Sequence, residues 1–162
     1  MPNAVSIIGH SLGAYTALAA AGGVPTSLPH ETKVAAHRCY TGSQNQVPSS
    51  PSAGVGLVQA EGALRAVNLP ILMLDAEKDL FTPLFHAQMI VGGVADPKKI
   101  QYRTVENAGH FSFLSPFPES MKSPTFLPSQ DPPGFDREHF HKTFNADILD
   151  FLYIHHDGRC DD

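Results

Sequence analysis

The sequence has few cysteines, few basic residues and no long hydrophobic run. The two cysteines, Cys39 and Cys160, cannot build a disulfide framework and form no CxxC pair, so we expect a reduced, cytoplasmic protein. Eleven lysines and arginines are scattered among sixteen acidic residues, and the formal net charge is −5 at pH 7. No basic patch points to nucleic acid or an anionic membrane surface. No stretch approaches the roughly 18 apolar residues of a membrane span, and Met1 is not followed by the pattern of a secretory signal.

Metal and cofactor patterns are also missing. His139 and His141 stand two apart in a predicted helix, which directs them to different faces and makes them poor ligands for one metal ion. The chain has no glycine-rich phosphate loop and no dinucleotide fingerprint. We therefore expect no metal and no cofactor.

Strand-like and helix-like segments alternate along the chain. With 162 residues, 42% of them hydrophobic, the chain has the size and composition of a single domain over 1–162 that buries a core. Apolar runs predict strands at 4–8 and 69–75, and an alternating pattern predicts one at 100–105. Helical patterns occur at 14–21, 57–67, 82–91 and 135–156. Segment 24–56 is irregular, and 115–134 is a proline-rich loop. This alternation predicts an α/β fold with a parallel sheet.

The pattern Gly9-x-Ser11-x-Gly13 lies between the first predicted strand and an alanine-rich helix. Such a turn is tight enough to force Ser11 into a strained backbone conformation and to lift its hydroxyl above the sheet. Small residues at 9 and 13 would let the helix approach the strand. The helix N-terminus would supply N–H groups to a developing oxyanion. A plain glycine-rich turn is the alternative, but the flanking strand and helix favour a nucleophilic serine.

A nucleophilic serine needs a general base that a carboxylate holds in the right tautomer. The expected chain order is serine, acid, histidine, with the last two following later strands. Asp79 follows the strand predicted at 69–75, and His110 follows the strand at 100–105. Asp75 is the rival acid, but it ends a strand, so Asp79 is favoured. Both loops would lie at the carboxyl edge of the sheet, where ligands bind.

The neighbours of these residues have less specific roles. His10 lies inside the turn, where packing and hydrogen bonding are more usual than proton transfer. Glu77 and Lys78 are expected to be solvated loop charges. The aromatic residues Phe81, Phe111 and Phe113 are equally compatible with a substrate pocket and with the core.

Three segments resemble the α/β-hydrolase superfamily, and within it the bacterial predicted dienelactone hydrolases related to platelet-activating-factor acetylhydrolases. They are Val-Ser-Ile-Ile-Gly-His-Ser-Leu-Gly-Ala at 5–14, Glu-Lys-Asp-Leu-Phe-Thr-Pro at 77–83 and Ala-Gly-His-Phe-Ser-Phe-Leu at 108–114. Ser-Gln-Asp-Pro-Pro-Gly-Phe-Asp at 129–136 fits the same group. The resemblance covers roughly 3–23 and 57–155, the C-terminal half of that fold.

The resemblance implies a mostly parallel sheet with helices on both faces and a serine esterase that acts on small or activated esters. Ser11 would be the nucleophile, His110 the general base and Asp79 the acid that orients it. The Leu12 amide would supply one oxyanion donor, and His10 and Phe111 are further candidates for the oxyanion and substrate-binding region. True dienelactone hydrolases use a cysteine nucleophile, so that name does not set the substrate.

The chain departs from the family in what precedes the serine turn. Family members have several strands before it and a loop that supplies a second oxyanion donor, and neither occurs in this sequence. The fold would thus be N-terminally truncated, with an exposed apolar strand that invites pairing. A second chain or protomer could complete the sheet. The alternative to an esterase is a non-catalytic hydrolase remnant or an interaction module.

Overall fold

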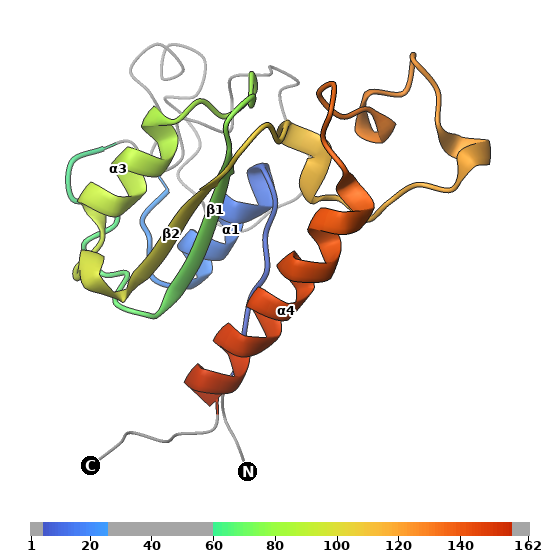
Figure 1. Ribbon diagram of the computed structural model, residues 1–162. Helices are drawn as coiled ribbons and strands as arrows, with labels where there is room; N and C mark the ends of the chain where they lie inside the picture. Colours follow the sequence, from blue (N-terminus) through green and yellow to red (C-terminus); the bar gives the residue numbers. More distant parts are fainter. Residues whose placement is uncertain (1–4, 26–59, 157–162) are drawn as a thin grey trace, which may run out of the picture. The chain divides into compact units, whose positions relative to one another are not determined.

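A computed structural model describes residues 5–25 and 60–156, which belong to two compact units. The sheet unit comprises Met1–Ile7, Pro70–Gln88 and Lys98–Asp162, and the elbow unit comprises Ile8–Leu69 and Met89–Pro97. The described residues have a mixed α/β structure, with one parallel two-stranded sheet and three α-helices (Figure 1). Nearly all of the irregular segment 24–56, and both cysteines, lie outside the described residues.

The sheet consists of β1 (Ile71–Ala76) and β2 (Ile100–Val105), which lie side by side in Figure 1. They pair in parallel, with Ile71 opposite Ile100 and Ala76 opposite Val105. These strands confirm the predictions at 69–75 and 100–105. Pro70 comes directly before β1, where its missing N–H costs no ladder hydrogen bond. Because the strands are parallel and in register, the loops that follow them emerge at the same edge of the sheet.

Helix α3 (Phe85–Gly93) connects the two strands and begins three residues later than predicted. The amides of Phe81 and Thr82 donate to the side chain of Asp79 at 2.7 and 2.9 Å, which fixes them in a turn instead of a first helical turn. Side chains that hydrogen-bond to nearby amides compete with helix formation in this way.

Helix α4 (Arg137–His156) confirms the predicted C-terminal helix. The side chain of Asp136 accepts a hydrogen bond from the His139 amide at 2.9 Å, as residues that begin helices commonly do. The preceding loop, 115–134, has only the short 3₁₀ turns η4 (Glu119–Met121) and η5 (Leu127–Ser129). Although α4 has 20 residues, no helix within 5–25 and 60–156 combines the length and apolar character needed to cross a lipid bilayer.

The elbow unit contains α1 (Leu12–Ala20), which confirms the helix predicted near 14–21. Its core is apolar and includes Tyr15, Leu18, Leu64, Val67, Ile90 and Val94. The predicted helix at 57–67 is wrong over its described part, because residues 60–66 form successive turns. Hydrogen bonds there span three residues, and Gly62 has φ +81°, which a right-handed helix does not accommodate.

The strand predicted at 4–8 is wrong for its described residues, 5–8, which have no regular secondary structure. Val5 is 86% exposed and Ile8 is 73% exposed. A strand needs a neighbour for its N–H and C=O groups, and the described sheet consists of β1 and β2 alone. The apolar run is therefore exposed among the described residues.

Candidate active site

The loop after β1 and the loop after β2 are joined by backbone hydrogen bonds. The Glu77 amide donates to the Val105 carbonyl at 3.1 Å, and the Lys78 amide donates to the Ala108 carbonyl at 2.8 Å. These bonds continue the parallel pairing beyond the strands. Asp79 follows in the first loop, while the second loop leads into the 3₁₀ turn η3 (His110–Phe113). The fold thus brings two sequence-predicted site residues together at one edge of the sheet.

Asp79 and His110 form a buried hydrogen-bonded pair. The distance from His110 Nδ1 to Asp79 Oδ2 is 2.8 Å, and their side chains are only 7% and 6% exposed, respectively. An ionised carboxylate only accepts hydrogen bonds, so Nδ1 is the donor. In the neutral imidazole the lone pair is then on Nε2, the nitrogen that acts as the base in Ser-His-Asp sites.

The carboxylate of Asp79 is also held by its own loop. The Phe81 and Thr82 amides donate to Oδ1, and Thr82 Oγ1 donates to Oδ2 at 2.6 Å. Burial is the largest single influence on the pKa of Asp79 and acts to raise it. The hydrogen bonds from His110, Thr82 and Phe81 together outweigh burial and lower the pKa from 3.8 to about 2. Asp79 is therefore ionised at neutral pH.

This low pKa makes the folding stability depend on acidity. A carboxyl group whose pKa is lower in the folded than in the unfolded protein stabilises the fold fully above its unfolded value, 3.8, and this stabilisation is lost as pH falls through about 2. We expect Asp79 to contribute about 2 kcal/mol that disappears between about pH 5 and pH 1. Urea unfolding of the wild type and of Asp79→Asn across this range measures the contribution. Equal pH dependence in the two proteins would contradict it.

Thr82 is a site residue that the sequence analysis missed. Thr82 Oγ1 also lies 3.5 Å from His110 Nδ1. The Asp-x-x-Thr spacing signals such a turn, because Asp side chains bond to amides two or three residues on. Glu77 is a solvated loop charge, as expected, with its side chain 45% exposed. Its carboxylate accepts the Asn107 amide at 2.7 Å, and this bond is the main cause that lowers the pKa of Glu77.

Aromatic rings surround His110 on more than one side. Phe81 lies 4.8 Å and Phe111 4.9 Å from the imidazole, measured between ring centroids, and Phe81 is 53% exposed. Phe113 instead packs against the rings of Phe140 and Phe144 on α4. Of the three aromatic residues left open by the sequence, two flank His110 and the third contacts the helix.

Asp75, the rival acid, is occupied elsewhere. It lies within β1 opposite Thr104, and its Oδ2 accepts the hydroxyl of Tyr102 at 2.9 Å. Burial is the main cause that raises the pKa of Tyr102, and the hydrogen bond to Asp75 adds to it. The other oxygen, Oδ1, is buried and has no hydrogen-bond partner among the described residues. This geometry favours Asp79 over Asp75 as the partner of His110.

Ser11, in the elbow unit, has the strained backbone expected of it. Its φ is 55° and its ψ is −123°, a combination that costs a residue with a side chain of order 1–3 kcal/mol. The turn is closed by the Gly13 amide, which donates to the His10 carbonyl at 2.9 Å. Leu12, whose amide was predicted to bind the oxyanion, is the first residue of α1.

The two glycines of the pattern have different roles. A Cβ atom on Gly9 would lie 2.3 Å from the Gly13 carbonyl oxygen, so the turn excludes any side chain there. A Cβ atom on Gly13 would meet no heavy atom within 4 Å in the described part of the chain, apart from its own helix and neighbours. The expected need for a small residue is thus confirmed at position 9, whereas no described atom requires it at position 13.

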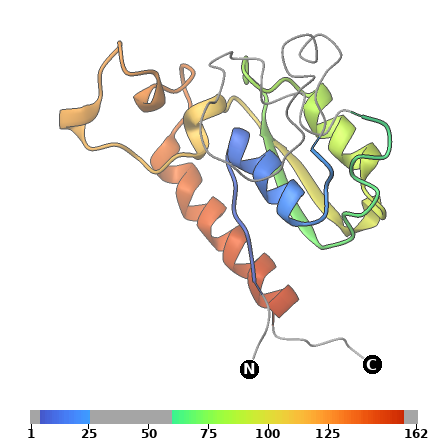
Figure 2. The ribbon, with the colours of Figure 1, turned by 180° about the vertical axis from the view of Figure 1, so that it is seen from behind.

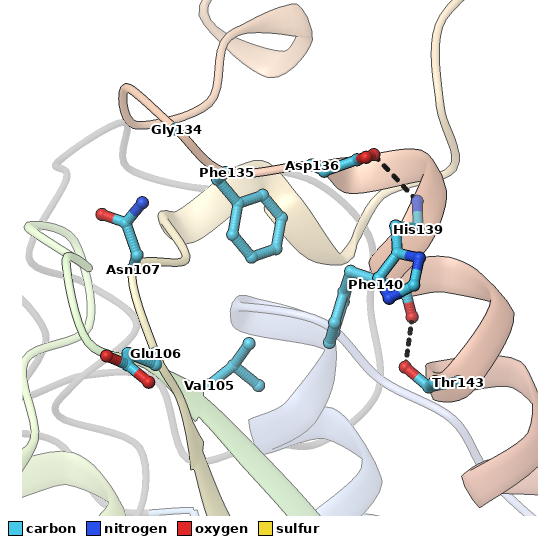
Figure 3. A pocket seen from close by; sticks show the side chains of 9 residues that line it. All are labelled: Val105, Glu106, Asn107, Gly134, Phe135, Asp136, His139, Phe140 and Thr143. Atoms are coloured by element: carbon cyan, nitrogen blue, oxygen red, sulfur yellow. Dashed lines mark hydrogen bonds between the residues drawn. The ribbon is translucent and has the colours of Figure 1, made fainter.

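A separate cavity of about 340 Å³ lies in the sheet unit (Figure 3). It is open to solvent, and the rings of Phe135 and Phe140 line it together with residues of the β2 end and the start of α4. Ser11, Asp79 and His110 are not among its lining residues.

The two histidines of α4 lie in different surroundings: His139 lines this cavity, whereas His141 is buried. No cluster of three potential metal ligands occurs in the described ranges.

Comparisons with protein-family models, curated proteins and solved structures found no match.

Proposed function

We propose that the protein is a serine hydrolase that cleaves carboxylic esters, with an α/β-hydrolase fold. The buried hydrogen bond between Asp79 and His110 carries the proposal. It fixes the tautomer that a general base needs and places an ionised carboxylate behind the ring. Ser11 supplies the second element, because its strained turn at a helix N-terminus is the usual setting for an activated serine.

The proposed reaction has two steps. Ser11 Oγ attacks the ester carbonyl carbon while His110 Nε2 takes the hydroxyl proton, and the Leu12 amide stabilises the oxyanion. The intermediate then expels the alcohol, which receives its proton from His110, and leaves an acyl-serine. In the second step His110 removes a proton from water, water attacks the acyl carbon, and the acid leaves as Ser11 regains its proton. The proposal requires Ser11 Oγ to come within hydrogen-bond distance of Nε2.

Labelling with a fluorophosphonate tests the proposal without knowledge of the substrate. The reagent phosphonylates only an activated serine, so the intact mass of the wild type should increase by one adduct, and Ser11→Ala should remain unlabelled. Ser120→Ala, which alters an exposed serine in η4, should label like the wild type. An adduct that persists in Ser11→Ala, or no adduct on folded wild type, would contradict the proposal.

The second candidate function is an interaction module derived from a hydrolase. The exposed apolar run at 5–8 favours it, because such a surface invites pairing with another chain or protomer. Folded protein that self-associates or binds a partner through this run, and takes up no fluorophosphonate, would support this second function.

A further inference from the structure

Ser112 makes several hydrogen bonds within and beyond the turn that carries His110. It lies two residues after His110 in η3 and is wholly buried. Its amide donates to the Gly109 carbonyl at 3.1 Å, and its Oγ accepts the Gly109 amide at 3.0 Å. The hydroxyl donates to Asp131 Oδ1 at 2.6 Å, and the Ser112 carbonyl lies 3.1 Å from His141 Nε2. Ser112 thus closes the turn on itself and ties it to the proline-rich loop and α4.

Asp131 is held in turn by Arg137, the first residue of α4. Arg137 Nε donates to Asp131 Oδ2 and Nη2 donates to Oδ1, each at 2.9 Å. The guanidinium also donates to the carbonyls of Pro128 at 2.9 Å and Gln130 at 3.2 Å. Arg137 is only 6% exposed. A buried bidentate pair with further donors satisfied is geometrically specific, so the position of the Asp131 carboxylate is tightly defined.

The turn that carries His110 is therefore held from two directions. Asp79 holds the imidazole through Nδ1, while Asp131 holds the turn through Ser112. Pro132 packs so closely on Gly109 that a Cβ atom there would lie 3.0 Å from its ring. The start of α4 lies beside η3 in both ribbon views (Figures 1 and 2). The turn thus has little freedom to rotate His110 away from Asp79.

We infer that Arg137, Asp131 and Ser112 are positioning residues that hold His110 in the orientation its base role requires. The inference rests on the proposed function, because His110 acts as a base only if the protein is a serine hydrolase. These residues do not contact the reacting atoms in this scheme. They act through the backbone of 109–112, which sets where the imidazole stands relative to Asp79. Placement errors of about 1 Å in such groups can lower rates by about 10²-fold.

The test uses Ser112→Ala, which removes the link while leaving the pair of Asp131 and Arg137 in place. Ser129→Ala is the matched control, since the Ser129 hydroxyl bonds to Ser123 and Phe126 in the same loop and makes no hydrogen bond to the described residues of the turn. The first readout is the ¹⁵N and ¹H NMR signal of the His110 ring, assigned with His110→Gln. We expect the Nδ1 proton signal of the wild type to broaden or shift in Ser112→Ala and to be unchanged in Ser129→Ala.

The second readout is ester hydrolysis. In Ser112→Ala we expect kcat to fall by about 10–100-fold, while KM changes less than about twofold. An unchanged imidazole signal and kcat in folded Ser112→Ala would overturn the inference. If Ser112→Ala does not fold, Asp131→Asn, which keeps the volume and removes the charge, is read in the same way. Loss of folding in both would assign these residues to the fold alone and also overturn it.

The NMR readout separates this inference from the proposed function. A wild type that takes up no fluorophosphonate but whose imidazole signal responds to Ser112→Ala would refute the hydrolase and retain the positioning. A labelled wild type with an unresponsive signal would retain the hydrolase and refute the positioning.

Discussion

Ser11→Ala and His110→Ala are each expected to lower the kcat of ester hydrolysis by about 10⁶-fold, and the double variant should lose no more than either single variant. The nucleophile and its base act as a unit. A serine hydroxyl that keeps its proton attacks the ester about as slowly as if the serine were absent. The measurement is hydrolysis of an activated aryl ester under saturating conditions, after far-UV circular dichroism has shown that each variant folds.

The comparison of single and double variants carries the most information. Ser11 belongs to the elbow unit and His110 to the sheet unit, so non-additive losses would show that the two residues function as one site. His139→Ala, which alters an exposed histidine on α4, should keep the wild-type rate. Losses that multiply in the double variant would contradict a shared site.

Asp79→Asn should lower kcat by about 10⁴-fold, the loss expected when the base is held in the wrong tautomer. The backbone amides of Phe81 and Thr82 already orient position 79, so an asparagine there would keep its carbonyl oxygen on Oδ1 and direct its NH₂ group at His110 Nδ1. The imidazole proton would then move to Nε2, where it blocks proton transfer from serine.

Asp75→Asn is the matched control for the same chemical change. Asp75 bonds to Tyr102 within the sheet and makes no hydrogen bond to His110, so most activity should remain. An asparagine at 75 can still accept the tyrosine hydroxyl. A loss in Asp75→Asn as large as that in Asp79→Asn would overturn the assignment of the acid.

The parts of the molecule that the sequence predicted well depend on local signals. β1 is a largely apolar run and β2 an alternating one, each of six residues, and each position was predicted within two residues. Because parallel strands end at one edge, their positions were sufficient to predict that Asp79 and His110 meet. The hydrogen bond at 2.8 Å agrees with that expectation.

The parts that failed depend on information outside the local sequence. The run at 5–8 has the composition of a buried strand, but pairing requires a neighbouring strand, and composition cannot show that one is present. Helix propensity at 60–66 is overridden by the positive φ of Gly62. The bond from Ser112 to Asp131 joins residues 19 positions apart in the sequence, and Asp131 in turn pairs with Arg137, six positions further on; no periodic pattern signals either contact. Arg137 is buried, which is rare for an arginine unless its charge is paired, and this burial is what identifies the contacts with Asp131.

The exposed ring of Phe81 beside His110 has a practical consequence. The chain contains no tryptophan, so Phe81→Trp would introduce a single indole at a position whose ring centroid is now 4.8 Å from the imidazole. A charged imidazolium interacts with an adjacent indole and quenches its emission, whereas the neutral ring does so much less. The fluorescence of that one side chain would report the charge of His110 in real time, with neither substrate nor inhibitor present.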